Sequence, residues 1–123
     1  SQIASIEYAA KVLGAQLCVV MGHSKCGAIQ AALDSETGKK QDLGPNIGFL
    51  VDLIRPSVQK CLAERGSQSD TLDRCIKQNV HSTAGEILEN SSILRTLVQE
   101  GRFQISEAVF HLETGTVNFE PQA

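Results

Sequence analysis

The feature that most constrains the fold is an apolar run followed at once by a tight turn. Residues 17–21 read Leu-Cys-Val-Val-Met, and Gly-His-Ser-Lys-Cys-Gly follows at residues 22–27. A continuous Val-rich run of this length is typical of a strand buried on both faces, as in a parallel sheet. Helical character resumes over residues 28–33. The segment therefore predicts a strand, a turn and a helix in succession.

Apolar residues at helical spacing predict further helices on either side of this unit. One covers residues 3–13 and ends at Gly14. The others are expected over residues 47–54, 62–66, 72–88 and 93–98. Pro56 is expected to end the first of these, Asp70 to cap the third, and Gly101 to end the last. The polar stretch 34–46 contains Gly and Pro and is predicted to be a surface loop.

The periodicity changes near the C-terminus. Apolar residues alternate with polar ones from Phe103, and residues 109–112 and 116–119 flank the turn Glu113-Thr114-Gly115. This pattern predicts a hairpin. Together the segments predict an α/β fold with a mostly parallel sheet, flanking helices and a C-terminal hairpin. At 123 residues the chain suits a single domain, 1–123.

Charge and composition exclude several classes of function. Eleven Lys and Arg against fourteen Asp and Glu give a net charge of −3, without a basic cluster for nucleic acid or anionic lipid. No apolar stretch approaches the roughly 20 residues of a membrane helix, and residues 1–5 do not resemble a leader. The four Cys are not needed as disulfides in a chain that is 41% hydrophobic, so we expect a reducing, cytoplasmic location.

The turn at residues 22–27 carries the residues that can do chemistry. His23 and Cys26 follow a strand, where ligands bind in open α/β sheets, and an imidazole and a thiolate are both good zinc ligands. Cys26 also lies near a helix N-terminus, which favours the thiolate. On spacing alone, three interpretations remain open: a metal site, a Cys26 nucleophile with His23 as base, and two structural residues. A phosphate loop is excluded because Ala28-Ile29 stands where Lys-Ser/Thr is required.

A family resemblance favours the metal site. Ser5-Ile6-Glu7-Tyr8-Ala9, Val19-Val20-Met21-Gly22-His23-Ser24-Lys25-Cys26-Gly27-Ala28 and Ala31-Ala32-Leu33 are similar to the core of a β-class carbonic anhydrase. Asn79-Val80 with Leu88 and Ile93 resembles that family's late helix pair, and residues 109–117 resemble its closing hairpin. The resemblance covers most of the chain, and the block around His23 is its most specific part.

The resemblance implies a zinc-dependent lyase. His23 and Cys26 would be two of three protein ligands of a catalytic zinc, and a water at the fourth position would be activated to attack carbon dioxide and give bicarbonate. It also implies a homodimer or a higher homo-oligomer. Glu7 and Tyr8 are expected to pack and cap rather than to catalyse.

One part of the family pattern does not occur in this sequence. The family's first ligand lies in a Cys-x-Asp-Ser-Arg segment, upstream of the part seen here, and that segment also carries a strand. The remaining candidates are poor substitutes: Cys18 is mid-strand, and Cys61, Cys75, His81 and His111 are expected to be core or surface residues.

Three explanations follow: a domain that is incomplete at its N-terminus, a short inactive relative that serves as a binding or structural module, or a site completed by a different ligand set, for example across a dimer. Because two ligands do not make a stable catalytic site, we expect weak or no activity from the chain as it stands.

Overall fold

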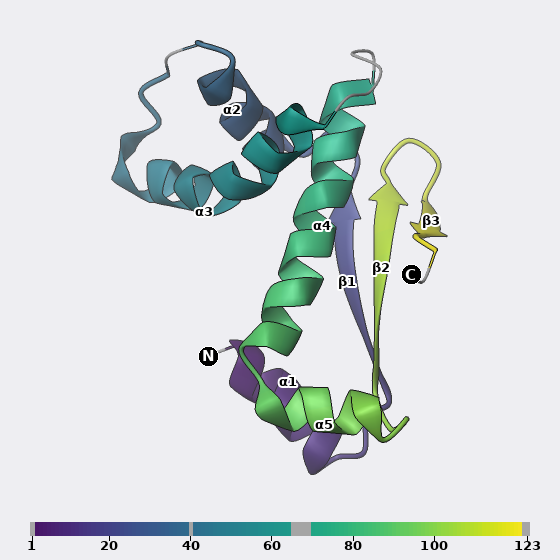
Figure 1. Cartoon of the computed structure of the whole chain (residues 1–123). Helices are drawn as coiled ribbons and strands as arrows, with labels where there is room; N and C mark the ends of the chain where they lie inside the picture. The colour runs from purple at the N-terminus through teal and green to yellow at the C-terminus, as the bar shows by residue number, and fades with distance from the viewer. Residues whose placement is uncertain (1, 40, 65–69, 122–123) are drawn as a thin grey trace.

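The computed structural model describes residues 2–39, 41–64 and 70–121. Five helices and three strands follow one another in this part of the chain (Figure 1): α1 Gln2–Lys11, β1 Leu17–His23, α2 Gly27–Glu36, α3 Gly44–Ala63, α4 Thr71–Glu89, α5 Ser92–Gln99, β2 Gln104–His111 and β3 Thr116–Phe119. The strand-turn-helix unit at residues 17–36 forms as the apolar run predicts.

The three strands form one mixed sheet in the order β1-β2-β3. β1 and β2 are parallel, with Leu17 opposite Gln104 and His23 opposite Phe110. β2 and β3 are antiparallel, with His111 opposite Thr116. The α/β class and the C-terminal hairpin are confirmed, and the long connection between β1 and β2 contains four of the helices.

β1 is not buried on both faces, so this part of the prediction is wrong. The side chains of Leu17 and Met21 are 53% and 50% exposed, because β1 pairs only with β2 and its other edge has no partner among the described residues. The residues between them, 18–20, are only partly buried. The apolar run therefore forms a strand as expected, but the described residues cover its side chains only in part.

The helices bury their apolar faces in two clusters. The larger one lies between α2, α3, α4 and β2, and its buried residues are Ile29, Ala32, Leu33, Val51, Ile54, Val58, Cys61, Cys75, Ile76 and Val109. The smaller one joins α1, the end of α4, α5 and the residue before β2, through Ala10, Ile87, Leu94, Leu97 and Phe103. Helix α4 contributes to both clusters and runs alongside β1 (Figure 1), so it connects the two halves of the core.

Several predicted helix ends are corrected by the structure. Helix α3 runs through Pro56 to Ala63, because Val51, Ile54 and Val58 stay buried on one face and their packing outweighs the lost backbone hydrogen bond. The loop predicted over 34–46 is shorter, since α2 ends at Glu36 and α3 begins at Gly44. Asp70 occupies the N-cap position of α4, but its side chain makes no capping hydrogen bond. Of the short helix predicted through 62–66, residues 65 and 66 lie outside the described residues.

Glu7 has the packing role that the sequence predicts. The Ser91 hydroxyl donates to Glu7 Oε2 at 2.5 Å and accepts from the Leu94 backbone N–H at 3.1 Å. Ser91 is the N-cap of α5 and is 1% exposed. The carboxylate of α1 therefore holds the cap of α5 and fixes the two helices against each other.

Candidate functional site

The loop at residues 23–26 lies at the carboxyl end of β1, as the sequence predicts. β1 ends at His23 and α2 begins at Gly27. The preceding residue, Gly22, packs against α4, where a Cβ in its place would lie 2.8 Å from Val80 Cγ2 and 3.1 Å from Ile76 Cγ2. A residue without a side chain is therefore required for β1 to approach α4 this closely just before the loop.

The His23 ring is oriented by the backbone of the next residue. Its Nδ1 lies 2.9 Å from the Ser24 carbonyl oxygen. A carbonyl can only accept, so this hydrogen bond requires Nδ1 to carry the proton and leaves the lone pair on Nε2. The side chain itself is exposed. This is the arrangement in which a neutral imidazole serves as a metal ligand.

Cys26 occupies the N-cap position of α2. Its φ of −66° and ψ of 115° are extended, its side chain makes no capping hydrogen bond, and it is half-buried. The thiol thus lies beside the N-terminus of a ten-residue helix. The loop offers one nitrogen donor and one sulfur donor, the ligand types that zinc prefers.

Ser24, between these two residues, ties the loop to the β2–β3 hairpin. Its backbone N–H donates to the Phe110 carbonyl at 2.8 Å, and its hydroxyl accepts from the Leu112 N–H at 2.9 Å and donates to Glu113 Oε2 at 3.1 Å. The Ser24 side chain is buried, and the residue is only 7% exposed. The hairpin therefore fixes the loop from a position far along the chain.

Lys25 completes the same network. It is a non-glycine residue with a positive φ, 54°, and its Nζ lies 3.4 Å from Glu113 Oε1. The pKa of the Glu113 carboxyl is lowered, first by a hydrogen bond from its own backbone N–H and then by Ser24 and Lys25. Sequence reasoning missed Glu113, because it lies 89 positions from Ser24 and no local pattern marks it.

Comparisons with known proteins identify the family. The carbonic anhydrase family model matches residues 1–117. Carbonic anhydrase 2 of Mycobacterium tuberculosis (strain CDC 1551 / Oshkosh) is 31% identical over 113 residues, which cover 92% of this chain. The β-carbonic anhydrase CafA of Aspergillus fumigatus has a similar structure, with a TM-score of 0.78 and 25% identity over 98% of this chain. The chain belongs to the β-class carbonic anhydrase family.

The chain spans about half the length of the relatives that it matches. It covers 53% of the M. tuberculosis protein, 51% of a Pseudomonas aeruginosa carbonic anhydrase that is 29% identical to it, and 55% of CafA. A β-carbonic anhydrase from Sordaria macrospora shares the fold, with a TM-score of 0.76 and 20% identity, over 98% of this chain and 60% of its own. The match to the family model confirms the recognition made from the residues around His23.

The described part of this family member does not complete a metal site. In residues 2–39, 41–64 and 70–121 no cluster of three or more His, Cys, Asp or Glu side chains could hold a metal ion. The His23–Cys26 loop therefore fits zinc by the chemistry of its donors, while the number of donors falls short of the three or four protein ligands that zinc takes. The metal role of both residues remains a prediction.

The other candidate ligands lie elsewhere. Cys18 packs against the smaller core cluster, and burial raises the pKa of its thiol. Cys61 and Cys75 are buried in the larger cluster, and burial together with the hydrogen bond that the Cys75 thiol donates to Cys61 raises the pKa of Cys75 to about 12. His111 Nε2 bonds Asn118 at the surface. The placement of these residues in core and surface agrees with the prediction.

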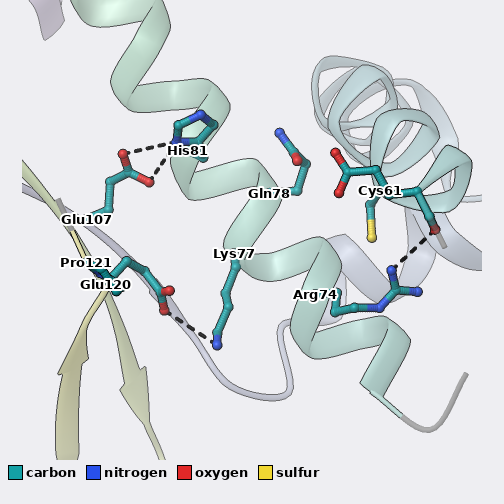
Figure 2. A pocket seen from close by; sticks show the side chains of 9 residues that line it. Cys61, Arg74, Lys77, Gln78, His81, Glu107, Glu120 and Pro121 are labelled. Carbon is teal, nitrogen blue, oxygen red and sulfur yellow. Dashed lines mark hydrogen bonds and ion pairs between the residues drawn. The ribbon is translucent and has the colours of Figure 1, made fainter. Parts of the chain in front are cut away.

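A separate cavity of about 330 Å³ lies between α3, α4, β2 and residues 120–121, which follow β3 (Figure 2). Its charged side chains are largely matched: His81 Nδ1 lies 3.0 Å from Glu107 Oε1, and Lys77 Nζ lies 3.6 Å from Glu120 Oε1. None of the residues that line it belongs to the His23–Cys26 loop. The cavity therefore offers no further ligand to that loop.

Proposed function

We propose that this protein takes part in the reversible hydration of carbon dioxide to bicarbonate, with zinc held at the His23–Cys26 loop. The observation that carries the proposal is the orientation of His23. Its Nδ1 donates to the Ser24 carbonyl, so Nε2 is the nitrogen with a free lone pair. Cys26 follows three positions later, at the N-terminus of α2.

Three residues of the loop have distinct tasks in this proposal. His23 would bind the metal through Nε2 and Cys26 through its sulfur, while Ser24 holds the turn between them. When bound, zinc supplies the Lewis acidity that makes water a nucleophile near neutral pH. Ala28 and Ile29 follow in α2, so apolar side chains adjoin the loop on the side of the core.

The remaining ligand has to come from beyond these 123 residues or from a second copy. The described part supplies two donors, and residues 1, 40, 65–69 and 122–123 include no His, Cys, Asp or Glu. A homo-oligomer is consistent with this requirement. The Sordaria macrospora β-carbonic anhydrases with a similar fold are tetrameric, and we propose a homodimer or higher oligomer here. For the 123-residue chain alone we expect weak or no activity.

We also propose a cytoplasmic location. The four cysteines are free, and thiols persist where the environment is reducing. No helix of the described residues is long and apolar enough to cross a membrane.

The incomplete donor set leaves a second candidate, a non-catalytic binding or structural module with the same fold, which the family match does not favour. It differs from the first in needing no metal. In this alternative, substitution of His23 would leave the behaviour of the protein unchanged.

The experiment that separates the two is a metal count on the natural gene product, together with its intact mass and its rate of carbon dioxide hydration. We expect one zinc per protomer, lost in His23→Ala and in Cys26→Ala. His81→Ala is a matched control, since this exposed His pairs with Glu107 and not with the loop. A folded natural product with neither zinc nor hydration activity would contradict the enzyme and support the module.

A further inference from the structure

We propose that Glu113 is a positioning residue, which acts through Ser24 to hold the His23 ring in the tautomer that leaves Nε2 free for a metal. This inference rests on the proposed metal function of His23 and deepens it. Glu113 belongs to the turn between β2 and β3, whereas His23 is the last residue of β1. The two residues are linked only by tertiary structure.

The first step is the connection from Glu113 to Ser24. Glu113 Oε2 accepts from the Ser24 hydroxyl at 3.1 Å, and the Lys25 ammonium lies 3.4 Å from Oε1. The Glu113 side chain is 42% exposed, so water weakens the ion pair, whereas Ser24 is only 7% exposed. The hydrogen bond to Ser24 is therefore the stronger constraint.

The second step is the connection from Ser24 to His23. Because the Ser24 hydroxyl also accepts from the Leu112 N–H, and its own N–H donates to the Phe110 carbonyl, this residue is held at both its backbone and its side chain. Its carbonyl accepts from His23 Nδ1 at 2.9 Å. A fixed carbonyl beside the ring selects the Nδ1–H tautomer, and outer contacts of this kind orient metal ligands.

The third step concerns what happens without Glu113. The hydroxyl of Ser24 would lose its acceptor, and it could rotate and weaken its bond with Leu112. Lys25 would also lose the partner that helps to hold its positive φ. Both changes loosen the Ser24 carbonyl, and the Nε2–H tautomer of His23 then becomes accessible.

Two substitutions and a control test the proposal. Glu113→Ala removes the acceptor and the charge, whereas Glu113→Gln keeps an oxygen acceptor for Ser24 and loses the charge. Glu120→Gln is the matched control, because it breaks an ion pair next to the same hairpin, with Lys77 at 3.6 Å, away from the loop.

The readouts are the ¹⁵N chemical shifts of the His23 ring at a pH where it is neutral, amide hydrogen exchange at Ser24 and Cys26, and titration with Co²⁺. We expect Glu113→Ala to shift the ring toward the Nε2–H tautomer and to speed loop exchange about tenfold. Its cobalt affinity should fall roughly 10- to 100-fold, as is usual when an outer contact of a ligand is lost. Glu113→Gln should stay close to the wild type in all three measurements, because it keeps the acceptor for Ser24, and Glu120→Gln should match the wild type.

An unchanged tautomer and unchanged loop exchange in Glu113→Ala would overturn the proposal. So would a changed tautomer with unchanged cobalt affinity in a chain that binds cobalt. If the natural gene product binds no cobalt, the proposed metal function fails, and the tautomer and exchange data alone then decide whether Glu113 positions His23.

Discussion

Gly22 of β1 lies so close to Val80 of α4 that a Cβ on the glycine would be 2.8 Å from Val80 Cγ2. This contact sets the distance between the sheet and the helix that joins both core clusters, immediately before the loop with His23. Ile76 Cγ2, at 3.1 Å, limits the space from the same helix. The close approach couples the packing of α4 to the position of the loop.

We predict that Gly22→Ala destabilises the protein by about 1–3 kcal/mol, because the added methyl group overpacks the contact with two buried side chains. Urea unfolding measures the effect. In the double variant Gly22→Ala/Val80→Ala the loss should be smaller than the sum of the two single losses, since the smaller side chain makes room. If the stability loss of the double variant equals the sum of the two single losses, the clash at residue 22 is relieved by residues other than Val80.

Gly85 in α4 should behave in the opposite way. It is exposed, and apart from its chain neighbours and the adjacent backbone of its own helix, no described atom lies within 4 Å of the position that an alanine methyl group would occupy there. Gly85→Ala should stabilise the protein by about 0.5–1 kcal/mol, because alanine loses less backbone entropy in a helix. Thermal unfolding of this variant beside Gly22→Ala compares the same substitution in open and in closed surroundings, and a loss of stability at Gly85 would refute the entropic argument.

Loss of the Ser91 cap should lower stability through both α5 and α1. Ser91→Ala removes the acceptor for the Leu94 N–H and the donor to Glu7. We expect a loss of about 1–2 kcal/mol, near the upper part of the range for a lost N-cap. Ser92→Ala, an exposed neighbouring position, should change stability much less. Equal losses in the two variants would argue against the capping role.

The four thiols should differ in reactivity. With a pKa raised to about 12 by burial and by the Cys61 hydrogen bond, Cys75 carries almost no thiolate near neutral pH. Cys26 is half-buried beside a helix N-terminus and should be alkylated first. Peptide mass spectrometry after a timed iodoacetamide pulse reads the order, with urea-unfolded protein as the reference in which all four react. Modification of Cys75 ahead of Cys26 in folded protein would be inconsistent with this packing.

The contribution of Glu113 to stability should depend on pH. Its pKa is lower in the folded protein than the ordinary value of 4.5, so its stabilising effect is complete above that value. The effect is lost as the pH falls through the lowered folded pKa, because the protonated carboxyl no longer favours the folded state. The difference in unfolding free energy between wild type and Glu113→Gln should therefore shrink below about pH 4.5. If the difference in unfolding free energy grows as the pH falls, the prediction is wrong.

Local sequence was sufficient for the elements that depend on near neighbours. The run from Leu17 to Met21 forms a strand, the glycine-bounded turn leads into α2, and Gly14 and Gly101 adopt positive φ values where helices end. The block of residues around His23 also identified the family, because its sequence resembles the β-class carbonic anhydrase core, whereas the His23–Cys26 spacing alone did not. Each of these features depends on the backbone geometry of a few consecutive residues, so the types of those residues are enough to predict it.

Tertiary structure decided the features that depend on distant partners. Met21 is exposed since only β2 pairs with its strand among the described residues, and α3 continues through Pro56 because buried side chains on both sides of the proline hold it in place. The pairing of Ser24 with Glu113 was not accessible from sequence at all. A residue pattern specifies which side chains can be buried or bonded, but which partners they meet is fixed by how the chain packs, and that is a property of the whole fold.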